Sequence, residues 1–194
     1  MLPSSCGQYH SRPWVSLEIV GMEQLDEIIR SSAAAIGPEY FQLPVAGREP
    51  ALYERVYCYE LYHQMRARWP ETNVFLTGEI PKRGHEIIMA NIGSAVVPDF
   101  LIHEPGNMDN NHAIIEVKSS LASSSGIRKD LATLDQFLIE VGYERAIYLF
   151  YGEEIDLDLV QKLAAERPVQ GRIEIWLHSK PGLQAEQIAE ILPR

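Results

Sequence analysis

Apolar positions along this chain recur at two different spacings, which predicts helices and strands in alternation. Steps of three and four residues predict helices over 15–36, 51–69, 157–166 and 184–192, and another from a serine cap at 123–125 to about residue 141. Short apolar runs bounded by turn residues predict strands over 73–80, 96–102, 113–118, 146–151 and 172–178. This order of elements is typical of an α/β sandwich around a mixed sheet.

The second and third predicted strands flank a segment rich in turn residues. Residues 104–111 contain glycine, proline and three asparagines, so we expect the two strands to pair as an antiparallel hairpin. With pairing symmetric about the loop, His103 faces His112 and Asp99 faces Glu116. Facing residues have Cβ atoms about 4.5–5.5 Å apart, and like charges in that arrangement repel. We therefore expect a cation between Asp99 and Glu116.

Lys118 follows Glu116 at a spacing of two residues. Side chains two apart on a strand share a face, so Glu116 and Lys118 project together, while Ile115 and Val117 point to the other side. Lys118 is then a diagonal neighbour of Asp99, but one ammonium group cannot saturate two carboxylates. A hard divalent cation completes the site, since Mg²⁺ binds carboxylate oxygens together with water and phosphate. The alternative is that Glu116 and Lys118 form the solvated end of a half-buried strand.

Pro98-Asp99 followed by Glu116-Val117-Lys118 resembles the motif of the PD-(D/E)XK nuclease superfamily, which has the restriction-endonuclease-like fold. The resemblance implies a three-layer α/β/α sandwich with a central mixed sheet. It implies that Asp99 and Glu116 hold one or two Mg²⁺ ions, for which Mn²⁺ can substitute. It also implies that the Val117 carbonyl adds a metal ligand and that Lys118 positions or activates the attacking water.

The helix predicted over 51–69 offers a further acidic ligand. Glu54 lies on the apolar stripe of this helix, together with Cys58. A carboxylate there is costly unless it is paired or binds metal, although the first turn of a helix also suits an exposed carboxylate. The superfamily often supplies an acidic residue from such a helix, and the resemblance makes Glu54 the first choice and Glu60, on a more polar side, the second. Glu79, at the end of the first predicted strand, is another candidate.

The net charge of −10 argues against a protein that coats DNA through a broad basic surface. A nuclease that acts on selected structures, or within a complex, needs only a local basic groove. The candidates for phosphate contacts are Lys82, Arg83, His85, Arg128 and Lys129. The resemblance favours Lys129, because the helix after the hairpin often lends a polar side chain to the site. The alternative for each of them is a solvated surface charge.

The composition is that of an ordinary globular chain. With 194 residues, of which 46% are hydrophobic and 23% charged, we expect a single globular domain. It divides into an N-terminal accessory helix and loop over 1–50 and a nuclease-like core over 51–194. The chain has no apolar stretch of membrane-spanning length and no signal-peptide pattern, so we expect a cytoplasmic protein without a membrane partner. Cys6 and Cys58 are too few for a disulfide scaffold, and no Cys/His spacing suggests zinc.

These observations lead to two functional hypotheses. The first is a Mg²⁺-dependent nuclease that cuts nucleic acid, DNA in preference to RNA, with specificity from a partner subunit, a homodimer interface or an unusual nucleic-acid structure. The second is a catalytically inactive binding or assembly protein on the same fold, which the acidic net charge favours. A third hypothesis, a nucleotide-binding α/β enzyme, is disfavoured because the chain has neither a GxxxxGK[ST] nor a GxGxxG phosphate loop.

Overall fold

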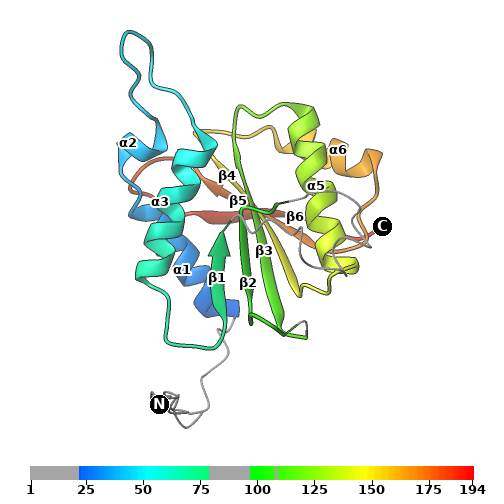
Figure 1. The fold of residues 1–194 in the computed structure, drawn as a ribbon. Coiled ribbons are helices and arrows are strands. Elements are labelled where there is room, and N and C mark those ends of the chain that lie inside the picture. Colours follow the sequence, from blue (N-terminus) through cyan, green and yellow to red (C-terminus); the bar gives the residue numbers. More distant parts are fainter. Residues whose placement is uncertain (1–21, 79–96, 108) are drawn as a thin grey trace, which may run out of the picture.

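The computed structural model describes residues 22–78, 97–107 and 109–194, in which the strands form one open mixed sheet (Figure 1). Within these residues the sheet has six strands, arranged in their chain order. The strands are β1 Phe75–Gly78, β2 Phe100–His103, β3 Asn111–Ser119, β4 Arg145–Tyr151, β5 Ile173–His178 and β6 Glu186–Ile191. The helices are α1 Met22–Ala34, α2 Pro38–Phe41, α3 Glu54–Ala67, α5 Ser124–Ile139 and α6 Leu157–Glu166.

The strand directions make the sheet mixed. β1, β2 and β3 pair antiparallel, β3, β4 and β5 pair parallel, and β6 returns antiparallel along β5. Each parallel connection passes through a helix, α5 after β3 and α6 after β4, because a tight turn cannot join parallel strands. The predicted α/β architecture around a mixed sheet is therefore confirmed.

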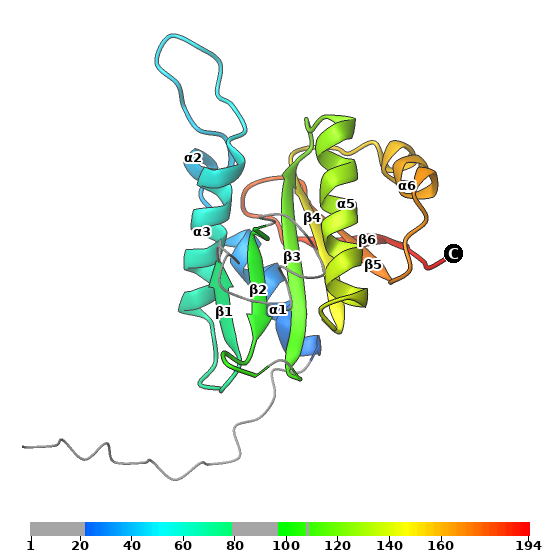
Figure 2. The same ribbon diagram turned by 45° about the vertical axis from the view of Figure 1, so that its right-hand side comes forward.

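Helices cover both faces of the sheet. α1, α2 and α3 pack on one face, and α5 and α6 pack on the other (Figure 2). β4 lies between the two layers with all seven of its residues buried, which its continuous apolar run predicts. Leu149 packs in the core beneath α1 to α3, whereas the neighbouring Tyr148 packs in the core beneath α5 and α6.

Local sequence sets the bounds of the helices on the second face. Ser123 caps α5, since its Oγ accepts a hydrogen bond from the Gly126 backbone N–H at 3.3 Å. Ile127 and Leu131 then bury the predicted stripe of this helix, and α6 has its predicted bounds. Among the described residues no helix is both long and apolar enough to span a lipid bilayer.

The C-terminal segment contradicts its prediction. The helix predicted over 184–192 is wrong, because β6 occupies this stretch and pairs with β5. Exposure along β6 alternates with a period of two, and at its end Glu190 is exposed while Ile191 is buried. Without β6, the outer edge of β5 would present a row of unpaired backbone groups. Long-range backbone pairing therefore overrides the helical spacing of this short segment.

Other predicted bounds change before the sheet begins. The loop predicted over 39–50 is wrong at its start, where α2 forms with Pro38 in its first turn. The strand predicted over 73–80 is confirmed as β1, which begins at Phe75. The helix predicted over 15–36 is confirmed over α1, and residues 15–21 lie outside the described part of the chain.

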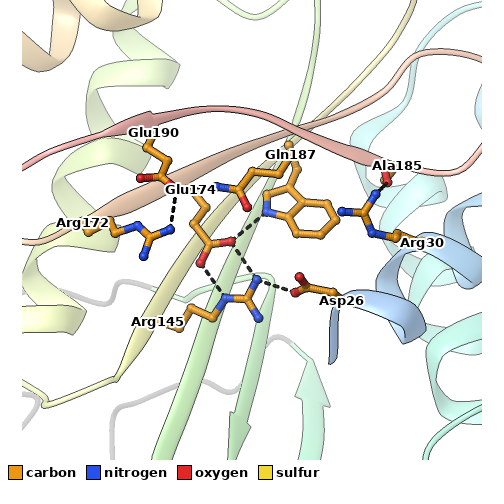
Figure 3. Close-up of polar contacts among 9 residues, drawn as sticks. Asp26, Arg30, Arg145, Arg172, Glu174, Ala185, Gln187 and Glu190 are labelled. Carbon is orange, nitrogen blue, oxygen red and sulfur yellow. Dashed lines mark hydrogen bonds and ion pairs between the residues drawn. The ribbon is translucent and has the colours of Figure 1, made fainter. Parts of the chain in front are cut away.

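A largely buried ion-pair network ties α1 to the parallel strands β4 and β5 (Figure 3). Arg145 of β4 donates to both carboxylate oxygens of Glu174 of β5, at 2.6 and 2.7 Å. The same guanidinium reaches Asp26 of α1 at 2.5 Å, and the Trp176 indole N–H donates to Glu174 at 2.9 Å. Because Arg145 begins β4, this network lies at the end of the sheet opposite to the carboxyl end of β3.

Candidate active site

The carboxyl end of β3 is the place where the fold gathers the predicted site. α3 and α5 both begin beside this end, and they approach it from opposite faces of the sheet (Figures 1 and 2). β2 begins at the same end, directly after Asp99. Because the N-terminus of a helix carries a partial positive charge, both helices favour negatively charged groups here.

Asp99 and Glu116 meet at this end of the hairpin. Phe100 pairs with Ile115, and one further step along both strands places Asp99 beside Glu116. Asp99 Oδ2 accepts a hydrogen bond from the Val117 backbone N–H at 2.8 Å, and the Asp99 and Glu116 carboxyl groups also share a hydrogen bond. The structure therefore brings together the two carboxyl groups that the hairpin pattern placed opposite each other.

The far end of the hairpin does not follow the symmetric register. His103 pairs with Asn111 instead of His112, because the register shifts after Ile102. The predicted pairing of His103 with His112 is therefore wrong. A bulge adds one unpaired residue to a strand, which a pattern of alternating residues does not reveal. His103 instead lies 3.2 Å from the Thr77 hydroxyl.

Burial raises the pKa of both carboxyl groups above their ordinary values. Glu116 is only 6% exposed, so the solvated strand end considered for it is wrong. Burial raises the pKa of Glu116 well above its ordinary value, and the charges of Asp99 and Asp130 raise it further. Burial also raises the pKa of Asp99 to about 6, against the opposing hydrogen bond from Val117. Deprotonation of the pair leaves two negative charges close together, which a divalent cation would neutralise.

Lys118 connects the two helix layers. Its Nζ lies 3.0 Å from Glu54 Oε1 of α3 and 2.9 Å from Asp130 Oδ2 of α5. Burial lowers the pKa of Lys118, but the charges of these two carboxylates and their hydrogen bonds outweigh that effect and raise it. Lys118 is therefore a fixed ammonium ion at the edge of the two-carboxylate cluster.

The geometry separates the two acidic candidates on α3. Glu54, in the first turn, reaches Lys118. Glu60 accepts a hydrogen bond from Gln64 on the same helix at 2.7 Å. Glu54 is therefore the acidic residue that α3 brings to the site, and Cys58, a buried free thiol, lies one turn after it.

Asp130 is the site residue that the sequence analysis missed. It is 4% exposed, and its Oδ2 also accepts a hydrogen bond from the Tyr148 hydroxyl at 3.0 Å. A signal was present, because Asp130 lies three residues after Ile127 and four before Leu134, on the core-facing side of α5. A buried acid on an apolar helix stripe needs a partner, as does Glu54.

The predicted phosphate contacts lie away from Lys118 or outside the described residues. Lys129 is exposed and lines a groove between α5 and α6, and Arg128, beside it, forms an exposed ion pair with Glu166 at 2.8 Å. The remaining candidates fall in residues that the structure does not describe. They are Lys82, Arg83 and His85, and the acidic-ligand candidate Glu79 also lies outside the described residues.

The donor set suits a metal ion that takes few protein ligands. In the described ranges, no three His, Cys, Asp or Glu side chains come together as a metal-binding group. Mg²⁺ is commonly held by one or two carboxylates, with water and phosphate oxygens completing its shell. Asp99 and Glu116 supply two such carboxylates, whose mutual repulsion a divalent cation would relieve. The residues present therefore fit Mg²⁺ held together with solvent and substrate.

Comparisons with known proteins add no family to this picture. No protein-family model, curated protein or solved structure shows a significant match to the chain. Function must therefore be inferred from the residues at the carboxyl end of β3 and from their geometry.

Proposed function

We propose that this protein is a Mg²⁺-dependent nuclease with a restriction-endonuclease-like fold, which hydrolyses phosphodiester bonds in DNA in preference to RNA. One observation carries the proposal. A buried carboxyl group, Glu116, and a partly buried one, Asp99, lie beside the fixed ammonium group of Lys118 at a single end of the sheet. This combination suits the hydrolysis of a phosphate ester, because it offers ligands for a hard cation and a positive charge for a phosphate.

Each of these side chains has a distinct role in the proposed reaction. Asp99 and Glu116 hold the metal, and Glu54 and the Val117 carbonyl are further candidate ligands. The metal, when bound, lowers the pKa of a water molecule and neutralises charge on the phosphate. Lys118 orients the attacking water and stabilises the negative charge that develops in the transition state.

The arrangement of the elements supports the same proposal. The motif residues stand on an antiparallel hairpin, β2 and β3, and β3 then pairs in parallel with β4. Helices on both faces begin beside the motif, and one of them supplies Glu54. These features agree with the three-layer sandwich that the resemblance implies.

A binding or assembly protein on the same fold is the second candidate, and one observation favours it. Much of the charge in the cluster is already neutralised within it, because Lys118 has two carboxylate partners and Asp99 accepts a hydrogen bond from a backbone N–H. A cluster whose charges are already paired can have a purely structural role. The net charge of −10 also suits a protein that binds no nucleic acid by itself.

The test combines metal binding with cleavage. Calorimetry measures Mg²⁺ and Mn²⁺ binding to the wild type, to Asp99→Ala and to Glu153→Ala, an exposed carboxylate in the loop after β4 that serves as the control. The same proteins are incubated with labelled single-stranded, duplex and branched DNA and with RNA. We expect Asp99→Ala to abolish metal binding and cleavage and Glu153→Ala to retain both. A wild type that neither binds metal nor cleaves would leave the assembly protein as the better proposal.

A further inference from the structure

A pocket lies beside Asp99, between α3 and the start of β2. It has a volume of about 420 Å³ and is lined by Cys58, Tyr59, Tyr62, Gly78, Asp99 and Phe100. The pocket therefore adjoins the proposed catalytic carboxylates. Three of its six lining residues are aromatic, which distinguishes it from the polar site next to it.

Two of the aromatic rings of the pocket stack on each other, and the third is exposed to solvent. Tyr62 stacks on Phe100 with ring centroids 6.1 Å apart and an interplanar angle of 20°. Tyr59, about one helical turn before Tyr62 on α3, is 60% exposed. A tyrosine ring that is left in water beside an apolar pocket has surface available for a ligand.

Gly78 keeps the pocket open on the β1 side. A Cβ at this position would lie 3.6 Å from the Tyr62 ring and 3.6 Å from the Asp99 carbonyl oxygen. Any longer side chain at position 78 would therefore enter the space between the Tyr62 ring and Asp99. Gly78 itself places no side-chain atom between the Tyr62 ring and the Asp99 carbonyl oxygen.

We infer that this pocket binds one unpaired nucleobase of the strand whose phosphate lies at Asp99 and Glu116. Aromatic side chains bind bases by stacking, and stacking tolerates any sequence because every base has a π-face. The volume of about 420 Å³ accommodates a base with its solvent. Asp99 lines this pocket and belongs to the carboxylate cluster, so a nucleotide whose phosphate lies at the cluster has its base next to the pocket.

The charge of the protein strengthens the inference. Attraction between phosphates and Lys or Arg supplies most of the affinity of ordinary DNA-binding surfaces. This chain has a net charge of −10, and the Lys118 ammonium group already has two carboxylate partners. Base stacking offers an affinity that does not depend on a positive surface.

The inference rests on the proposed nuclease function and narrows its substrate class. A base inside an intact duplex is stacked and paired, so it cannot enter the pocket without unstacking. The pocket therefore selects single strands, frayed ends or flipped nucleotides over uninterrupted duplex.

The experiment measures binding without cleavage. Fluorescence anisotropy in EDTA compares a labelled single-stranded DNA oligonucleotide, its RNA equivalent, the same DNA strand with abasic sites, and a blunt duplex, each with the full chain. The variants are Tyr59→Ala and Tyr59→Phe, with Tyr40→Ala as the control because Tyr40 is also an exposed tyrosine but lies on α2. Circular dichroism verifies that each variant folds.

We expect the wild type to bind the single strand several-fold more tightly than the duplex or the abasic strand. Tyr59→Ala weakens single-strand binding about tenfold or more, whereas Tyr59→Phe, which keeps the ring, stays within about twofold. Equal binding of single strand and duplex, no binding of the single strand, or equal effects of Tyr59→Ala and Tyr40→Ala would overturn the inference. Mg²⁺-dependent cleavage that persists in that case would leave the nuclease proposal intact, while Tyr59-dependent binding without cleavage would contradict the nuclease proposal alone.

Discussion

The Lys118 ammonium group lies 2.9 Å from the Oδ2 of Asp130, which joins the end of β3 to the first turns of α5. Lys118 also reaches Glu54 of α3 at 3.0 Å, so two helices on opposite faces of the sheet hold the same ammonium group. Asp130 is in turn fixed by the Tyr148 hydroxyl. Asp130 would therefore remain a carboxylate partner of Lys118 if Glu54 bound a metal ion.

Replacing Asp130 tests whether it positions Lys118. We expect Asp130→Asn to leave Mg²⁺ affinity nearly unchanged and to lower kcat for cleavage about 10- to 100-fold, because the amide keeps the contact with Tyr148 but loses the charge that fixes Lys118. Separate measurement of kcat, KM and Mg²⁺ affinity distinguishes this effect from a general loss of structure. The exposed Asp158 of α6 provides the control Asp158→Asn. A kcat equal to that of the control would show that Asp130 does not contribute to the reaction.

Asp99→Asn is expected to stabilise the metal-free protein. The pKa of Asp99 rises from 3.8 to about 6 on folding, mainly through burial. The folded chain thus binds the proton more tightly, and the stability gained by protonation is lost as the pH rises through about 6. At pH 8 the ionised carboxylate costs up to about 3 kcal/mol, so we expect Asp99→Asn to gain about 1–3 kcal/mol.

Urea unfolding in EDTA measures this difference. The gain should shrink as the pH falls below about 6 and approach zero at about pH 3, where both Asp99 and the unfolded carboxyl group approach full protonation. Glu153→Gln, at an exposed position, is the charge-matched control. No gain for Asp99→Asn at pH 8 would mean that the carboxylate is better solvated than its burial indicates.

Mg²⁺ binding is expected to strengthen as the pH rises. Both proposed metal ligands must lose their protons first, and burial raises the pKa of Asp99 to about 6 and that of Glu116 well above its ordinary value. Binding should therefore be weak at about pH 5, increase through neutrality and release protons. Calorimetry in two buffers with different ionisation enthalpies counts the released protons. A constant affinity from about pH 5.5 to 8 would be incompatible with these two ligands.

The two arginine pairs near β5 should differ sharply in their contribution to stability. Arg145 is buried with Glu174 and also pairs with the partly exposed Asp26, so Arg145→Met leaves a buried carboxylate without its cation and should cost about 3–5 kcal/mol. Arg172 pairs with Glu190 with 57% of its side chain exposed, so Arg172→Met should cost at most about 1 kcal/mol. Urea unfolding of the two variants under the same conditions compares them directly. Similar losses would show that the network in Figure 3 is better hydrated than its geometry indicates.

Periodicity alone was sufficient to predict an element where that element buries a whole face by itself. The continuous apolar run of β4 and the amphipathic stripe of α6 gave their elements and nearly all of their bounds. The same holds for the shared face of Glu116 and Lys118, because alternation along a strand is a local property.

The sequence by itself thus determined the alternation of helices and strands and the hairpin that carries Asp99 and Glu116. Only the tertiary structure decided that Asp130 and Glu54 hold Lys118, and that the segment 184–192 is the strand β6. The tertiary structure alone also decided the bulge that separates His103 from His112. The physical reason is that buried charges and unpaired strand edges are satisfied by partners far away in the chain, and local spacing contains no record of those partners.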